Sequence, residues 1–218
     1  MTTYRHISAS PIGLIQQVAV QYVTHGYWFY VRGEVPLDKS PEQVDVKLLD
    51  QYGIAISRWA RARRKKRGLA NVHYIRFGRV FVMLATGGQH DFFQQESQSI
   101  CDVRRKPLRL FGHSIGYRLG RDGKRHASVR IEASEYNQLK AWLEEIATRR
   151  SAKKVEQIFR SLGYARYAPV RSQLACLLRA VNRRRKKAGF ELLDPSCVRI
   201  RRRVLRPFET SDVRSLVD

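Results

Sequence analysis

The chain has 218 residues, 43% of them apolar and 10% aromatic, and a formal net charge of +23 at pH 7. Enough apolar residues are present to build a core, which excludes a disordered basic tail. No apolar stretch approaches the roughly 18 residues that a membrane helix needs, and residues 1–10 lack the apolar segment of a signal peptide. We therefore expect a folded cytoplasmic protein.

The positive charge is distributed unevenly along the chain. Residues 1–56 hold four basic and five acidic side chains, whereas residues 57–218 hold 38 basic and 14 acidic ones. Repulsion among so many like charges opposes compaction, and phosphates relieve it when a nucleic acid binds and releases its counterions. We therefore predict a nucleic-acid partner, RNA or DNA. A membrane surface is the weaker alternative, because no face rich in Trp, Phe and Leu lies opposite the basic runs.

The first segment, 1–56, is nearly neutral and is expected to form a helix–strand–helix module. A helix is predicted over 11–25, an aromatic and β-branched strand over 27–35, and a second helix over 41–52 after a capping box at 40–43. We expect this module to pack against the basic part of the chain or to bind a protein partner.

The second segment, 57–131, combines a basic helix with β-hairpins. The predicted helix over 58–67 has seven basic residues among its ten, and Gly68 follows it as a left-handed cap. A turn at Asp122-Gly123 indicates a hairpin. The other elements are five short strands at 74–76, 80–85, 107–111, 114–119 and 125–131, and a short helix at 91–98.

The third segment, 132–218, is basic and mainly helical. Apolar residues recur at helical spacing over 136–146, 155–162 and 170–181, and apolar residues and arginines alternate over 198–205 as in a strand. The whole pattern predicts an α+β protein of antiparallel hairpins and packed helices, with an arginine-rich three-helix segment and a strand at its C-terminal end.

Two basic runs, at 63–66 and 184–187, end predicted helices just before a glycine. The helix dipole favours one or two such cations, but like charges at i and i+4 destabilise a helix, so we interpret the runs as phosphate contacts. Helix 169–187 is also a candidate recognition helix of a helix–turn–helix. The predicted nucleic-acid-binding residues are Arg58, Arg61, Arg63, Arg64, Lys65, Lys66, Arg67, Arg76, Arg79, Arg171, Arg179, Arg183, Arg184, Arg185, Lys186, Lys187, Arg199, Arg201 and Arg203.

Aromatic side chains near the basic segments suggest contacts to bases. Phe77 lies at a predicted turn, and Tyr164 and Tyr167 lie in a predicted loop, where unpaired bases can stack on them. Trp59 and Phe81 are expected to be buried instead. The sequence therefore predicts mainly backbone recognition, with stacking at a few positions.

The sequence offers little for catalysis. Asp91, Glu96 and Asp102 are the candidate carboxylates for a nuclease, with His90 as a candidate acid, but no His-x-His pair is present. The three cysteines are widely spaced, so neither a disulfide framework nor a zinc site is predicted. We expect a non-enzymatic accessory protein of a ribonucleoprotein or of a mobile-element or plasmid complex, without metal or cofactor. An endonuclease or strand-transfer enzyme is the alternative.

Overall fold

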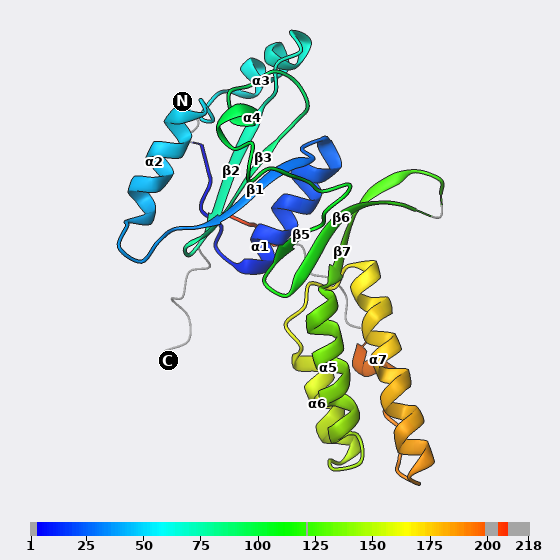
Figure 1. Ribbon diagram of the computed structural model, residues 1–218. Coiled ribbons are helices and arrows are strands. Elements are labelled where there is room, and N and C mark those ends of the chain that lie inside the picture. The colour runs from blue at the N-terminus through cyan, green and yellow to red at the C-terminus, as the bar shows by residue number, and fades with distance from the viewer. Residues whose placement is uncertain (1–3, 121, 199–204, 209–218) are drawn as a thin grey trace. The chain divides into compact units, whose positions relative to one another are not determined.

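The computed structural model describes residues 4–120, 122–198 and 205–208. Its helices and sheets confirm the predicted α+β class (Figure 1). The described residues form two compact units. Unit 1 takes them from Met1–Leu108, Gly116–Ala127 and Leu205–Asp218, and unit 2 takes them from Arg109–Ile115 and Ser128–Val204. These bounds differ from those of the three segments defined by charge, so both units contain strongly basic sequence.

Unit 1 is built on a four-stranded antiparallel sheet with the strand order β2-β3-β1-β4, and β1, β2 and β3 are labelled in Figure 1. The strands span Phe29–Glu34 (β1), Val72–Phe77 (β2), Val80–Ala85 (β3) and Cys101–Asp102 (β4). β2 and β3 cover the strands predicted at 74–76 and 80–85 and form an antiparallel hairpin, whose turn places Gly78 in the left-handed region with a φ of +57°. Aromatic and β-branched residues fill these strands because their side chains pack well on a pleated surface.

A helical stretch of three successive types precedes the sheet. It consists of α1 (Pro11–Gln16), a π-helical turn η1 (Gln17–Tyr22) and a 3₁₀ turn η2 (Val23–His25). The Ser10 hydroxyl accepts a hydrogen bond from a backbone amide at its start, and Gly26 ends it in the left-handed region. The helix predicted over 11–25 is confirmed, although its middle is wound more widely than an α-helix.

Three further helices of unit 1 are α2 (Pro41–Gln51), α3 (Arg58–Lys66) and α4 (Phe92–Gln95). The Ser57 hydroxyl caps α3 by accepting a hydrogen bond from the Ala60 amide at 3.2 Å. Ser40 precedes α2, but its hydroxyl donates to the Glu42 carboxylate and makes no capping bond to the helix. The predicted helix is confirmed. The predicted capping box is wrong, because the Ser40 side chain makes no hydrogen bond to the helix backbone.

A second sheet contains β5 (Leu108–Leu110), β6 (His113–Leu119) and β7 (Arg125–Ile131) in that order. The predicted turn joins β6 and β7, since Gly123 has a φ of +73° and the Gly120 amide donates to the Lys124 carbonyl at 2.7 Å. All three strands agree with their predicted ranges to within a residue.

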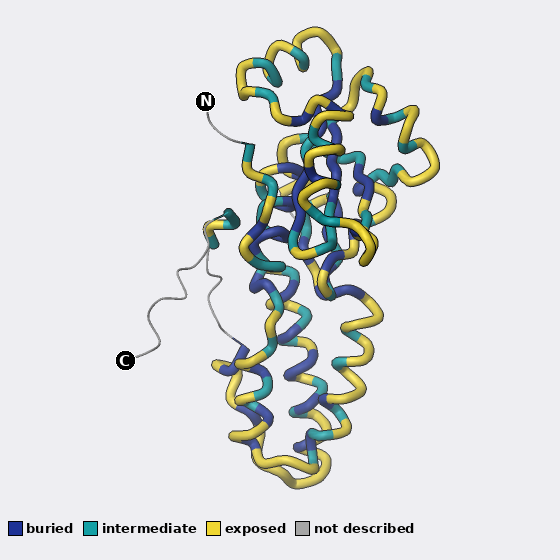
Figure 2. The backbone as a smooth tube through the Cα atoms, turned by 90° about the vertical axis from the view of Figure 1, so that its left-hand side faces the viewer, coloured by how far each residue is buried: buried dark blue, intermediate teal, exposed yellow. Residues whose placement is uncertain are grey.

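In the part of unit 2 that the structure describes, α5 (Ala133–Ile146), α6 (Ala152–Ser161) and α7 (Ala168–Lys187) are followed by a 3₁₀ turn, η3 (Pro195–Val198). Leu143, Phe159 and Leu174 are among the buried residues of their common core. Buried positions recur along each helix with exposed ones between them (Figure 2). Each helix is therefore amphipathic, as its spacing predicts.

The predicted strand over 198–205 falls mainly on 199–204, outside the described residues. Arg199, Arg201 and Arg203 lie in that range, so these predicted contacts also fall outside the described residues. Val198 itself ends η3.

Candidate nucleic-acid interface

α3 presents a basic surface along its length. Arg63, Lys65 and Lys66 are exposed, as are Arg58 and Arg67 at its two ends. The helix has no acidic residue, and none of these five side chains forms an ion pair with a carboxylate among the described residues. Five positive charges therefore face solvent on this helix without a counter-charge from the described part of the chain.

Trp59 is exposed, and the prediction that it is buried is wrong. Its residue is 80% exposed, and α3 has no buried residue. Arg63 and Lys66 follow Trp59 by four and seven positions, so the three side chains share one face of the helix. An exposed indole among cations is suited to stack on an unpaired base. Residue type alone predicts the opposite, because large aromatic side chains are usually buried.

Two arginines of α3 have structural partners instead. Arg61 Nη1 donates to the Val72 carbonyl at 2.9 Å, and its Nη2 donates to the Ile54 carbonyl. Arg64 donates from Nε and Nη2 to the Ala70 carbonyl at 3.2 and 3.1 Å. These bonds hold α3 to the segment that enters β2, so the two guanidinium groups support the fold of unit 1.

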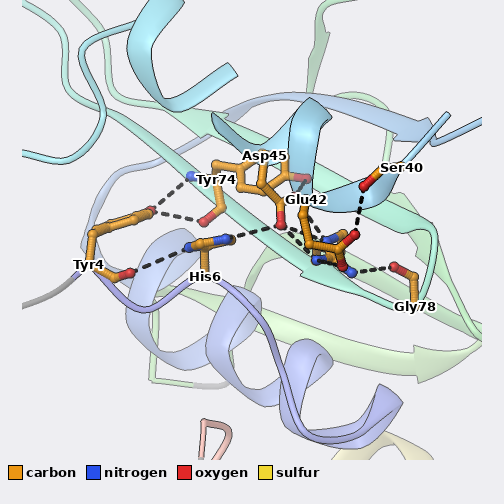
Figure 3. A network of polar contacts seen from close by, with 8 residues as sticks. Tyr4, His6, Ser40, Glu42, Asp45, Tyr74 and Gly78 are labelled. Atoms are coloured by element: carbon orange, nitrogen blue, oxygen red, sulfur yellow. Dashed lines mark hydrogen bonds and ion pairs between the residues drawn. The ribbon is translucent and has the colours of Figure 1, made fainter. Parts of the chain in front are cut away.

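Arg76 lies inside unit 1, and the prediction that it contacts phosphate is wrong. The residue is 5% exposed, and its guanidinium donates to both carboxylate oxygens of Asp45 at 2.6 to 3.0 Å. The Tyr74 hydroxyl and the His6 ring bind the same carboxylate (Figure 3). Burial alone raises the pKa of Asp45, but the hydrogen bonds from His6, Arg76 and Tyr74 outweigh it and hold the pKa at about 2. Arg76 is therefore neutralised within the protein.

The turn between β2 and β3 holds two further predicted contacts. Arg79 is half-buried and donates to the backbone carbonyls of Val35, Pro36 and Lys39, so it ties the turn to the segment after β1. Phe77 is also half-buried. Both side chains are thus largely committed to the fold.

α7 carries the second basic surface. The helix has no acidic residue, and its exposed cations form no ion pair with a carboxylate among the described residues. A groove of about 840 Å³ lies between α7 and residues 192–198. Its walls contain four exposed cations of α7 and apolar side chains such as Leu178 and Leu192. The exposed cations are Arg171, Arg179, Arg183, Arg184, Lys186 and Lys187.

Arg185 is the exception in this run, and the prediction that it contacts phosphate is wrong. The residue is 1% exposed, and its guanidinium donates to the backbone carbonyls of Ala147, Arg150 and Glu191. A charge held by three carbonyls inside unit 2 is inaccessible to a nucleic-acid backbone.

The predicted stacking tyrosines and the recognition helix stay hypotheses. Tyr164 and Tyr167 are half-buried and pack against the core of unit 2, so each offers only part of its ring. The link between α6 and α7 covers residues 162–167, longer than the three- or four-residue turn of a helix–turn–helix. The arginines of α7 expected to enter a major groove, Arg171, Arg179 and Arg183, are nevertheless exposed.

Three of the four candidate catalytic side chains have local partners, and the fourth, Asp91, is exposed. Glu96 accepts a hydrogen bond from the Tyr52 hydroxyl at 2.6 Å, and Asp102 forms an ion pair with Arg104 at 2.6 Å. The Nδ1 atom of His90 accepts a hydrogen bond from a backbone amide. Within the described ranges, no three His, Cys, Asp or Glu side chains gather so that they could hold a metal ion.

No protein family, no curated protein and no solved structure matches this chain. Across the described residues, every helix is too short or too polar to span a membrane. The charge and geometry of α3 and α7 are therefore the basis on which a function can be proposed.

Proposed function

We propose that this protein binds the phosphate backbone of RNA or DNA and does not itself catalyse a reaction on it. Such a protein would act as an accessory component of a ribonucleoprotein or of a mobile-element or plasmid complex. The proposal depends on one observation, the exposed cations of α3 and α7, five on the first and six on the second, without a carboxylate partner among the described residues.

Helix chemistry alone does not account for these cations. The helix dipole stabilises a cation in the last turn by about 0.3–1 kcal/mol, but it opposes one in the first turn. Arg58 begins α3, and Arg171 lies near the start of α7, so both stand at the unfavourable end. Like charges along each helix add further repulsion. Phosphates remove both penalties, which favours a polyanionic partner.

The test is a titration of binding against salt. Filter binding of labelled RNA and DNA at salt concentrations between about 50 and 200 mM should give a log–log slope that corresponds to roughly six or more phosphate contacts. A slope near zero would show that phosphate contacts do not drive binding and would overturn the proposal.

Two triple variants locate the contacts. They are Arg63→Ser, Lys65→Ser and Lys66→Ser on α3, and Arg184→Ser, Lys186→Ser and Lys187→Ser on α7. Each leaves the structural arginines, Arg64 and Arg185, in place, so we expect a smaller salt slope and weaker binding with an unchanged fold. The matched control removes three exposed charges from the near-neutral segment, at Arg32, Lys39 and Lys47. An equal loss in the control would mean that net charge, not these helices, drives binding.

The absence of catalysis is tested separately. Purified protein incubated with labelled single- and double-stranded RNA and DNA, with magnesium or manganese, should give no cleavage above a blank. Cleavage that disappears in a His90→Ala, Asp91→Ala, Glu96→Ala variant would establish the alternative, a nuclease, and locate its site.

A further inference from the structure

Unit 1 contains an aromatic pocket that no sequence pattern indicated. Its volume is about 580 Å³, within the range of about 300–1,000 Å³ that is usual for small-molecule sites. Rings from four separate parts of the chain line it, and two exposed arginines, Arg5 and Arg58, lie at its edge. The rings belong to Tyr4, Tyr22, His25, Tyr27, His73 and Phe208.

Four of these rings pack on one another around His73. Tyr22 stacks on His73 with centroids 4.5 Å apart and an interplanar angle of 28°. Tyr4 lies beside His73, nearly in its plane, because its hydroxyl is 3.0 Å from His73 Nδ1 and the two rings make an angle of 14°. Tyr27 is tilted at 52° to His73, with centroids 4.9 Å apart. A flat heteroaromatic ring in this pocket would therefore meet ring faces and a ring edge together.

The Tyr4, Tyr27 and His73 side chains of the pocket are uncharged at neutral pH. Burial raises the pKa values of the Tyr4 and Tyr27 phenols, and burial, with the positive charge of Arg61, lowers the pKa of His73 to about 3. Besides Arg61, the arginines that bring positive charge to this site are Arg5 and Arg58, which are exposed at the edge.

One hydrogen-bond acceptor on the pocket wall has no donor among the described residues. The Tyr4 hydroxyl donates to the Tyr74 carbonyl at 2.9 Å (Figure 3), so His73 Nδ1 is the donor in its 3.0 Å contact with that hydroxyl. His73 Nε2 is then an acceptor, and it forms no hydrogen bond with another described residue. An amino or imino group of a ligand would satisfy it.

We propose that this pocket takes one unstacked base of a single-stranded nucleic acid, with Arg5 and Arg58 on the adjoining phosphates. The inference rests on the proposed nucleic-acid binding and adds a preference for single strands. Arg58 is the first residue of α3, so the pocket is continuous with the basic surface of that helix. Every base has a π-face, and stacking on aromatic side chains is the common way of holding a single strand without sequence specificity. A duplex would have to unpair and unstack to fill the pocket.

The first test uses the unaltered protein. A strand of about 12 nucleotides is compared with a fully abasic strand of the same length and charge, which keeps every phosphate and removes every base. We expect the abasic strand to bind at least about fivefold more weakly, the loss of one stacked base. Equal affinity for the two strands would overturn the proposal that the pocket binds a base, and it would leave the proposed phosphate binding intact. If neither strand binds, the proposed function fails and the pocket inference fails with it.

The second test alters the pocket. Tyr27→Leu removes a half-buried ring that packs on His73, and Tyr117→Leu is the matched control, a half-buried tyrosine in β6 outside the pocket. We expect Tyr27→Leu to weaken single-strand binding by at least about fivefold and to leave duplex binding unchanged. An equal effect on both substrates, or the same effect from Tyr117→Leu, would overturn the inference. Tight binding of a free mononucleotide that a strand does not displace would assign the pocket to a small ligand instead.

Discussion

The Arg185 guanidinium donates a hydrogen bond from Nη1 to the backbone carbonyl of Ala147, the residue that caps the C-terminus of α5. The same Nη1 donates to the Arg150 carbonyl at 3.0 Å, and Nε donates to the Glu191 carbonyl at 2.5 Å. Carbonyls at the end of a helix lack intrahelical partners, and here a buried arginine donates hydrogen bonds in their place. One member of a five-residue basic run thus joins two helices of unit 2, while its neighbours face solvent.

This division predicts opposite effects for neighbouring substitutions. Arg185→Met removes the donors from three carbonyls, so we expect it to lower the free energy of unfolding by roughly 2–4 kcal/mol. Arg184→Met, at an exposed position, should change that free energy by less than about 0.5 kcal/mol but weaken nucleic-acid binding. Urea denaturation followed by the helical circular dichroism signal, with filter binding in parallel, distinguishes them. Reduced affinity with unchanged stability in Arg185→Met would place that guanidinium at the surface.

Asp45 is predicted to be essential to unit 1. Asp45→Asn leaves the Arg76 charge buried without its carboxylate, which costs about 3–5 kcal/mol in comparable buried pairs. Glu42→Gln removes an exposed carboxylate 3.3 Å from the same guanidinium and should have little effect, because solvent screens it. Urea denaturation measures both.

A double variant separates the lost contact from the stranded charge. If the unpaired guanidinium causes the destabilisation, Asp45→Asn with Arg76→Met should be more stable than Asp45→Asn alone. A double variant that is less stable than the single one would show that Arg76 stabilises unit 1 mainly through other contacts, such as its 2.9 Å hydrogen bond to the Gly78 carbonyl.

Local patterns predict most of the elements of this fold. Alternation and turn residues are sufficient for β6 and β7, and apolar spacing is sufficient for α5, α6 and α7, because these signals lie within a single element. The roles of individual arginines are harder to predict. A basic run places cations on every face of its helix, so the run itself does not show which of them is buried. Arg185 carried a signal, because it follows Leu174, Leu178 and Val181 at helical spacing and continues their buried stripe.

The aromatic pocket could not be predicted in this way. Tyr4, the Tyr22–Tyr27 segment and His73 are distant in the sequence, and only the tertiary fold brings their rings together. Each of these aromatic residues, considered alone in the sequence, is typical of an ordinary hydrophobic core. Trp59 shows the converse problem, since its size predicts burial while its helix offers no apolar face to bury it.

Trp59 is predicted to report directly on binding. An exposed indole next to the cations of α3 should stack on a base, so its fluorescence should be quenched when nucleic acid is added. Trp59→Ala should weaken binding several-fold with no change in melting temperature, because the residue is 80% exposed. Trp142→Ala is the matched control, since that tryptophan is 45% exposed on α5 of unit 2. If quenching persists in Trp59→Ala and vanishes in Trp142→Ala, the base contact is on α5 instead.

His73 makes the stability of unit 1 depend on pH. Burial and the positive charge of Arg61 lower its pKa to about 3 in the folded protein, whereas an unfolded histidine titrates near 6.5. Between these values the unfolded chain binds more protons than the folded one, so the free energy of unfolding falls as the pH falls. The contribution of His73 to the free energy of unfolding is complete above about pH 6.5. Below that pH it decreases by at most about 1.4 kcal/mol per pH unit.

His73→Asn isolates this effect, because asparagine keeps a donor near the Tyr4 hydroxyl and does not titrate. Urea denaturation between about pH 5 and 6.5 should show a shallower fall in stability for the variant than for the unaltered protein. Burial also lowers the pKa values of His90 and His113, and these residues remain in both proteins, so some pH dependence should persist. Identical slopes would mean that His73 takes up a proton in the folded state as readily as in the unfolded one, and the aromatic pocket would then be open to water.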